Sequence, residues 1–483
     1  MLIDWLLILG YISLIFLLAY RAGKKSTPHG LTGNLEKIAQ EQYLANKSLT
    51  FTESICSIIA TEVSALTFLG IPAFAFNSDF SFIQIYMGAV AARLVIALVF
   101  LPKVYDQGLT IYEIIASGAK TPTGRQTVAV FYSIAKIFSV GVRLFSGSIL
   151  VAHFIGINIY VGLAAVTFIT FLYTLIGGLK AVVRTDILQM GLFIAGGLVA
   201  HYLIPDVSGS TWGELMSVAH NAGKTSFFNF SNPMPFILGV MGGILFDMAT
   251  HGVDQDFAQR LMANQSLKKA QAAIFLSSFL SIAVGLLFLG VGALLWAHYQ
   301  NHPMPASVAS ADHLFSYFIV NYFPAGIRGL MVAGVLAATM STLDSTINAL
   351  CATMYNDIVP KRTADKIKFF SYIDTLVITV LLFIIAVVSS KNDGLLMLGL
   401  RIQSWTGGTL LALFMSRVIF RKWFDYPFNF TAVLGAYVFG TLGVYLNTYV
   451  FEWNWNLNVY MGWGMALAWL KFYSFRKSTT PEF

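Results

Sequence analysis

Residues 57–74 of the chain read SIIATEVSALTFLGIPAF. The surrounding segment, 50–77, is long and apolar enough to cross a bilayer, yet its middle carries polar and helix-breaking residues. These are Thr61, Glu62, Ser64, Thr67, Gly70 and Pro72. Unwound backbone is tolerated at membrane depth only where it lines a cavity. The segment therefore predicts an interrupted membrane helix beside a binding site.

The whole chain has the composition of a membrane protein. Its 483 residues are 57% hydrophobic and only 11% charged, whereas a soluble domain has about 25% charged residues. The two cysteines, Cys56 and Cys351, lie in apolar segments, so we expect neither a disulfide framework nor a cysteine-rich metal site. These features predict an all-α polytopic membrane protein.

Apolar runs of about 20 residues, the length that crosses a bilayer as a helix, divide the chain into about 13 expected spans. They cover residues 2–21, 50–77, 80–104, 127–154, 157–177, 183–205, 234–257, 270–298, 325–357, 367–390, 393–416, 428–449 and 457–474. The first run has no basic residue before it and no small-residue cleavage site. We therefore interpret it as a retained helix and not as a signal peptide.

The basic residues favour one orientation in the membrane. Most of the 30 Lys and Arg residues fall on one side of the expected spans, beginning with Lys24 and Lys25. Because positive charge gathers on the cytoplasmic side, we expect the N-terminus outside and the C-terminus in the cytoplasm, in a plasma (inner) membrane. The net charge of +7 is then an anchor at the inner leaflet and implies no nucleic acid partner.

A second interrupted helix is expected five spans later. Residues 242–260 read GGILFDMATHGVDQDFAQR, with Asp247, Thr250, His251 and Asp254 at membrane depth or just below it. Two broken helices in corresponding places of two blocks are typical of secondary transporters, which bind substrate and coupling ion where the helices break.

Residues 336–350, LAATMSTLDSTINAL, form the third informative segment. Spacings of three and four place four of its residues on one helix face. They are Ala338, Ser341, Thr342 and Ser345. Hydroxyl and freed carbonyl oxygens suit a small hard cation, although such hydroxyls can also bond back to the preceding turn. The carboxylates of Asp186 and Asp344 favour the cation, because charges inside spans are expensive and usually functional.

Other classes of protein lack their signatures. There is no phosphate-cradling loop of an ATPase and no filter-like repeat of a channel. His251 has no nucleophile or metal partner nearby in the sequence, so we expect no enzyme. A sensor would need an attached signalling domain, and only about nine residues follow the last expected span.

Four segments in order resemble the sodium:solute symporter family. They are ATEVSALTFLGIPAFAFNSDFSFI (60–83), GGLKAVVRTDILQ (177–189), DQDFAQR (254–260) and GLMVAGVLAATMSTLDSTINAL (329–350). Within the family, residues 67–83 are most similar to bacterial sialic acid symporters. The resemblance implies sodium-coupled symport of a small polar organic solute, a carboxylate such as sialic acid, by alternating access. Sugar, amino-acid and proton-coupled symport stay as alternatives.

The resemblance also implies an architecture. It predicts one transmembrane domain, 1–483, with a LeuT-type fold of two inverted five-helix repeats at 50–205 and 234–416. The helix at 2–21 and two helices at 428–474 would be peripheral.

The family's sodium (Na+) sites carry over to named positions. The shared site matches the carbonyls of three residues and the hydroxyls of two. These are Ala60, Val63 and Ala338, and Ser341 and Thr342. A second site of some members matches Asp186, Ser341, Asp344 and Ser345. Asp344 replaces a serine there, so the number of sodium ions, one or two, stays open.

The substrate residues that the resemblance implies are less uniform. Ser64, Thr67, Phe82 and Arg143 match residues that hold sialic acid, with the arginine on the carboxylate. At three positions this chain departs from members of that family. It has Tyr86 in place of a glutamine, Glu62 in place of a threonine and Asp247 in place of an asparagine.

A mid-span arginine needs an anionic partner and offers a carboxylate a fork of donors. Glu62 or Asp247 is the alternative internal partner of Arg143. Lys136, two turns before Arg143, either adds positive field or pairs locally, and the mixed charges also suit a zwitterion.

Overall fold

The computed structural model describes residues 2–26, 35–175, 179–229, 234–306, 308, 310–359, 367–391 and 394–479. Helices make up most of these residues, and the only extended pairing among them is a single bridge between Leu49 and Asn264. The all-α prediction is confirmed.

In the described ranges, nine helices are long and apolar enough to cross a membrane, and one bent pair makes a tenth. The nine are built on α1 (Leu2–Ser26), α5 (Ile83–Val95), α8 (Thr123–Ile155), α10 (Leu179–Ser208), α12 (Met234–Asp247), α14 (Leu267–Asn301), α16 (Ile327–Thr353), α17 (Ile367–Ser389) and α19 (Phe430–Tyr449). The bent pair is α3 (Phe51–Glu62) with the helical segment that ends in α4 (Ile71–Asn77).

Three further helices coincide with the remaining expected spans, so every expected span is found as a helix. They are α9 (Ile159–Thr174), α18 (Leu395–Phe414) and α20 (Asn458–Thr479). The short helix α6 (Leu101–Val104) is the end of the expected span 80–104. The span rule did not predict the short helices α2 (Leu35–Leu44), α7 (Ile111–Ile115), α11 (Trp212–Asn221), α13 (Gln255–Met262) and α15 (Ala311–Tyr322). π-Helical turns occupy residues 66–70, 96–100, 248–252, 354–358 and 415–419.

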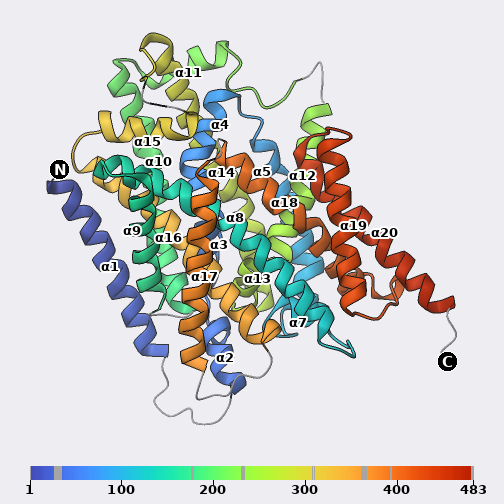
Figure 1. The fold of residues 1–483 in the computed structure, drawn as a ribbon. Helices are drawn as coiled ribbons and strands as arrows, with labels where there is room; N and C mark the ends of the chain where they lie inside the picture. Colours follow the sequence, from blue (N-terminus) through green and yellow to red (C-terminus); the bar gives the residue numbers. More distant parts are fainter. Residues whose placement is uncertain are drawn as a thin grey trace.

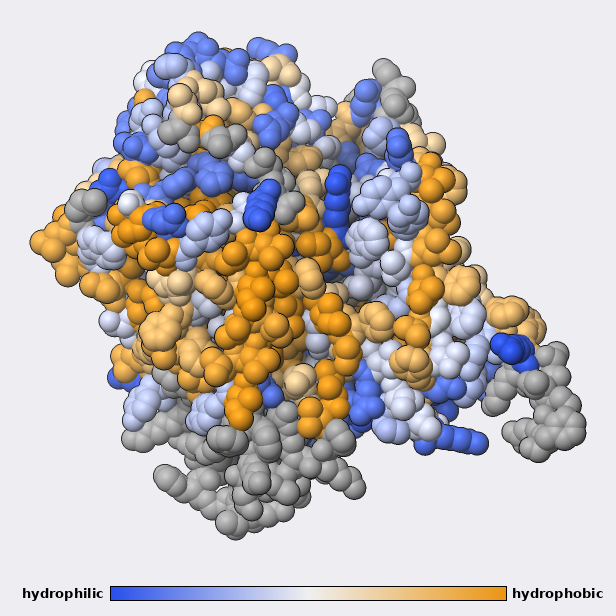
Figure 2. Space-filling view, in the orientation of Figure 1, coloured by the Kyte–Doolittle hydropathy of each residue, from blue (hydrophilic) through white to orange (hydrophobic). Residues whose placement is uncertain are grey.

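The surface fits a lipid environment. In Figure 1, α1 and α17 run along the height of the molecule, α11 and α15 lie near its top, and α2 and α7 lie toward its bottom. Figure 2 shows a broad hydrophobic band across the middle of this face, with hydrophilic side chains gathered above it. Leu6 and Leu17 of α1, Val380 and Ile384 of α17 and Val438 of α19 are among the exposed apolar side chains. Such a band matches the hydrocarbon layer of a bilayer.

The centre of the molecule is α16, which is buried along almost its whole length and packs against α8, α10 and α1. An aromatic cluster holds the π-helical turn that follows the first break. The ring of Phe68 lies 5.4 Å from Phe193 of α10, 5.1 Å from Phe288 of α14 and 5.4 Å from Phe315 of α15. Three helices therefore fix the position of this turn.

Both predicted helix breaks are present. The first lies after Glu62, where Val63 adopts an extended conformation (φ −82°, ψ 107°), and the two halves are bent by 60°. The second follows the turn 248–252, and Asp254 caps the next helix by accepting a bond from the Asp256 amide. Each break frees backbone groups that a continuous helix would pair internally.

The crossing of α5 and α12 depends on glycine. A methyl group on Gly88 would overlap the carbonyl oxygen of Val240 and lie 2.8 Å from the amide of Ile244. We expect Gly88→Ala to lower the free energy of unfolding by about 1–3 kcal/mol through overpacking, measured as a lower thermal midpoint in detergent. Gly191→Ala on α10 is the matched control, because no atom lies within 4 Å of its added methyl. Equal midpoints would contradict the close crossing.

Candidate substrate and cation sites

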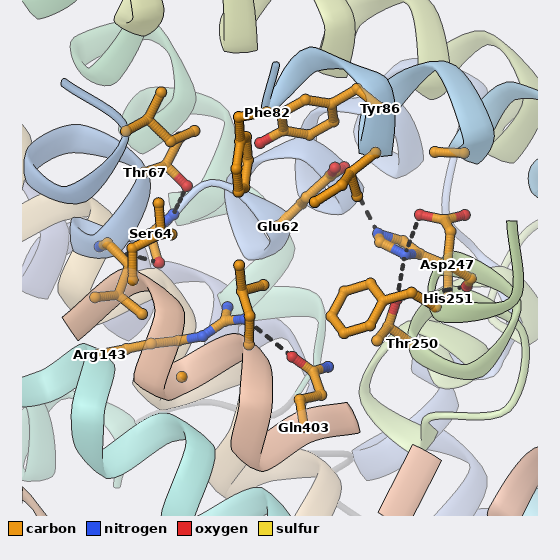
Figure 3. A pocket seen from close by; sticks show the side chains of 18 of the residues that line it. Glu62, Ser64, Thr67, Phe82, Tyr86, Arg143, Asp247, Thr250, His251 and Gln403 are labelled. Carbon is orange, nitrogen blue, oxygen red and sulfur yellow. Dashed lines mark hydrogen bonds and ion pairs between the residues drawn. The ribbon is translucent and has the colours of Figure 1, made fainter. Parts of the chain in front are cut away.

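The two breaks face one pocket with an empty volume of about 730 Å³. All six predicted substrate residues line it, and Figure 3 shows them around the cavity. They are Ser64, Thr67, Phe82, Tyr86, Arg143 and Asp247. Glu62, Thr250, His251 and Gln403 line it as well. The structure thus brings together residues from α3, the turn after it, α5, α8, α12 and α18.

The first break orients the two hydroxyl residues. The amide of Ser64 donates to Thr67 Oγ1 (3.3 Å), and the amide of Leu66 donates to Ser64 Oγ (3.2 Å). Beside them, Phe82 and Tyr86 meet edge to face with ring centroids 5.7 Å apart. The pocket therefore combines hydroxyls fixed by unwound backbone with an aromatic wall.

Arg143 reaches the pocket from α8. Its Nη2 donates to Gln403 Oε1 (3.4 Å), while its Nε is buried and has no hydrogen-bond partner among the described residues. Among the described residues, no carboxylate lies within ion-pair distance of the Arg143 guanidinium. The alternative interpretation, an internal pair with Glu62 or Asp247, is wrong, because another arginine holds both carboxylates.

That other arginine is Arg93 of α5, whose side chain is fully buried. Its Nη2 lies 2.8 Å from Glu62 Oε2 and 3.2 Å from Asp247 Oδ1. Its Nη1 donates to Ser277 Oγ (2.8 Å) and Ser281 Oγ (3.0 Å) of α14. We gave Arg93 no role from the sequence, although its place inside a span was the available signal. Glu62 and Asp247 are therefore paired inside the protein, so they are not the free carboxylates that binding of a zwitterion would use.

Lys136 pairs locally and adds no free positive charge. Its Nζ lies 2.8 Å from Asp254 Oδ2 and 3.2 Å from Asp256 Oδ2. It lines a second hollow of about 360 Å³. Thr250 and Gln403 line both hollows, so these two side chains form the floor between them.

Two of the ligands predicted for the first cation site are in contact. Ser341 Oγ of α16 donates to the carbonyl oxygen of Ala60 (3.1 Å). In a continuous helix the amide of Ser64 would take that carbonyl, but the break diverts this amide. Thr342 Oγ1 donates to the carbonyl of Ala338 in its own helix (3.1 Å), which is the back-bonding alternative. Val63 stands at the break itself.

The second predicted site contains two fully buried carboxylates. Asp186 Oδ2 accepts a hydrogen bond from Ser57 Oγ (2.5 Å), and its Oδ1 lies 2.6 Å from Ser341 Oγ, whose single proton goes either to this carboxylate or to the Ala60 carbonyl. Asp344 Oδ1 accepts from Ser345 Oγ (3.3 Å), whereas its Oδ2 has no hydrogen-bond partner among the described residues. These carboxylate and hydroxyl oxygens, one of them unpartnered, fit a hard cation such as sodium.

Arg260 of α13 was not foreseen as a member of this group. Its Nη2 donates to Ser345 Oγ and lies 3.7 Å from Asp186 Oδ2. Its Nη1 lies 2.5 Å from Asp256 Oδ1. A guanidinium thus shares the oxygens that we assigned to a cation, although DQDFAQR (254–260) had already been noted as a motif.

A model of the sodium:solute symporter family matches residues 42–424. The chain belongs to this family. Among its relatives, the sodium-coupled monocarboxylate transporter 2 of Bos taurus is 27% identical over 399 residues, covering 79% of this chain and 64% of the relative. The human protein of the same name is also 27% identical, covering 83% and 66%. The chain therefore spans about two thirds of the length of these relatives.

A bacterial member of the symporter family also matches. The sodium/sialic acid symporter of Proteus mirabilis is 25% identical over 365 residues, covering 74% of this chain and 71% of the relative. All of these relatives are named as transporters and none as an enzyme.

Solved structures of other transporters share the fold. A sodium-coupled sialic acid symporter in a substrate-bound, outward-open state superposes with a TM-score of 0.85 at 19% identity, covering 99% of this chain and 98% of that chain. A nucleobase–cation symporter in a closed conformation gives 0.61 at 16% identity, covering 92% and 96%. The predicted LeuT-type fold of this symporter-family chain is confirmed.

Removing Arg93 should unfold or strongly destabilise the protein. Arg93→Gln leaves the buried carboxylates of Glu62 and Asp247 without their cation, a loss of about 3–5 kcal/mol for a broken buried pair. We expect a large fall in the thermal midpoint of the purified protein. Arg401→Gln, at an exposed position of α18, should change the midpoint little. An unchanged midpoint in Arg93→Gln would show that the two carboxylates do not depend on it.

Proposed function

We propose that the chain is a sodium-coupled symporter that imports a small organic carboxylate by alternating access. The observation that carries this proposal is Arg143, a pocket guanidinium that has no carboxylate partner among the described residues. Arginine presents parallel N–H donors that match the two oxygens of a carboxylate. In a buried pocket such an ion pair is stronger than in water because the effective dielectric constant is lower.

The names of the relatives support the same substrate class. The monocarboxylate transporters and the sialic acid symporter are both named for acids. Ser64 and Thr67 lie on one side of the pocket, where their hydroxyls suit polar groups of the substrate body, and Phe82 suits its apolar face. Gln403, the neighbour of Arg143, would yield to the carboxylate or orient the guanidinium toward it.

Sodium would act at the first break. Ala60 and Val63 supply carbonyls on one side, and Ser341 and Thr342 supply hydroxyls from α16. An ion there would join the broken helix to the central helix and keep Ser64 and Thr67 ordered for substrate. Sodium drives transport only if it binds the two states unequally, and the membrane potential adds about 2.3 kcal/mol per charge per 100 mV. Asp186, Asp344 and Ser345 supply the candidate second site.

The layout of the proposed transporter follows the family pattern. Residues 50–205 and 234–416 would be the two inverted repeats, with 2–21 and 428–474 at the periphery. The N-terminus would face outward and the C-terminus the cytoplasm of a plasma (inner) membrane, as the basic residues favour.

Arg143 gives the test of substrate class. We expect proteoliposomes with an inward sodium gradient to take up labelled sialic acid or lactate with saturation, and not with an equal choline gradient. Arg143→Gln should raise the half-saturating concentration roughly 10- to 100-fold, since a hydrogen bond to a charged group contributes about 1.5–3 kcal/mol. Arg143→Lys keeps the charge but loses the fork and should fall between.

Arg401→Gln is the matched control for this series. Saturable uptake of glucose or proline in place of either acid would contradict the carboxylate assignment.

Ser341 gives the test of the sodium site. Ser341→Ala removes a proposed ligand, so the sodium concentration for half-maximal uptake should rise about tenfold or more. Thr353→Ala removes another buried hydroxyl of α16, which bonds only to its own helix at the carbonyl of Ala349 (2.9 Å). This control should keep wild-type sodium activation. Equal sodium activation in Ser341→Ala and the wild type would contradict the site.

A further inference from the structure

His251 joins the two broken helices. It lies in the turn 248–252 that ends the first half of the second broken helix, and it faces Glu62, the last residue of α3 (Figure 3). Its Nδ1 lies 2.8 Å from Asp247 Oδ1 and 3.0 Å from Thr250 Oγ1. Its Nε2 lies 3.1 Å from Arg93 Nη2 and 3.6 Å from Glu62 Oε2.

The group around His251 lacks one positive charge. Arg93 supplies one cation, whereas Glu62 and Asp247 supply two anions, and the side chains of both anions are at least 88% buried. A net charge buried in a membrane protein is expensive unless it is paired. Within this group, His251 is the side chain whose proton uptake supplies the missing charge near neutral pH.

Most of the other charged and titratable groups around this site are already matched or exposed and do not supply that charge. From the neighbouring elements these are Tyr86, Lys136, Arg143, Asp254, Asp256 and Arg260. Lys136 and Arg260 are matched by Asp254 and Asp256, and Arg401 of α18 is exposed. Among the described residues, this leaves Arg143, across the pocket, as the cation without a matching carboxylate, and it compensates the excess negative charge. When a carboxylate substrate binds Arg143, that compensation ends.

The ring geometry provides for two protonation states. A neutral ring with its proton on Nδ1 donates to Asp247 and accepts from Arg93 at Nε2. A second proton turns Nε2 into a donor. The hydrogen bond from Arg93 Nη2 (3.1 Å) would then have to yield, and Glu62 Oε2, 3.6 Å away, would have to approach as the acceptor. The ring centroid of Phe257 lies 4.0 Å from that of His251, and an aromatic face stabilises a cation.

We propose that His251 binds a proton together with the substrate carboxylate, so that anion and proton enter the pocket as a pair. The inference rests on the proposed function for its substrate and adds a third species to the cycle. Glu62, which His251 faces, directly precedes Val63 of the proposed first cation site. By linkage, the proton strengthens substrate binding as much as substrate strengthens proton binding.

Uptake of labelled sialic acid and of lactate at fixed sodium and varied pH tests this inference. From about pH 5 to 8, we expect the half-saturating concentration of the wild type to rise, by up to tenfold per pH unit above the titration of His251. His251→Gln should give a nearly flat profile. Asp247→Asn, which removes the excess negative charge and keeps the side-chain shape, should flatten it too. His220→Gln, at an exposed site on α11, should keep the wild-type slope.

A readout without transport separates the two proposals. In protein labelled with ¹⁵N-histidine, the His251 signal, identified by its loss in His251→Gln, should shift to the doubly protonated form when sialic acid or lactate is added at constant pH. Without added acid, the same signal should still titrate between about pH 5 and 8.

No uptake of either acid at any pH would overturn the proposed function, while a titrating His251 signal would still support proton binding. A His251 signal that stays neutral over the whole range would overturn the proton inference. The proton inference would also be overturned if the half-saturating concentration for uptake did not depend on pH in the wild type. It would be overturned as well if the pH dependence were unchanged in His251→Gln.

Discussion

The architecture of the pocket depends on one buried guanidinium. Arg93 pairs with Glu62 at the end of one interrupted helix and with Asp247 at the end of the other, and it also bonds to two serines of α14. Without it, two carboxylates would stand uncompensated at membrane depth, where unpaired charge is most costly. Because both carboxylates pair with Arg93, Arg143 on the opposite wall has only the side-chain amide of Gln403 as its hydrogen-bond partner among the described residues, and its guanidinium can bind an anion from solution.

The sequence predicted those features that depend on local chemistry. The spans follow from the length of the apolar runs. Both breaks follow from polar residues with glycine or proline inside a span, and the structure has them at Val63 and at Val253–Asp254. Helical spacing also placed Ser341 and Ser345 on one face. The predicted substrate residues came from the resemblance to a family, and all six of them line one pocket in the structure.

Ion pairs between charges that are distant in the sequence could not be predicted in the same way. Glu62 or Asp247 was the alternative partner predicted for Arg143 of α8. The cation that pairs with both is instead Arg93 of α5, because α5 crosses α12 closely at Gly88. Arg260 entered the expected cation site from α13, a short helix that the span rule did not find. Such choices depend on which helices touch, and a pattern of apolar and polar residues leaves that open.

Arg93 also joins four helices into one group. Its contacts tie α3, α5, α12 and α14 to one another at mid-membrane. Arg143 and Gln403, by contrast, belong to α8 and α18 and share a hydrogen bond of their own. Separating the first four helices would break a buried ion network, whereas among the described residues α8 and α18 make no ion pair with any of these four helices. We therefore expect those four to rock as one rigid body, with the solute held at the seam between the two bodies.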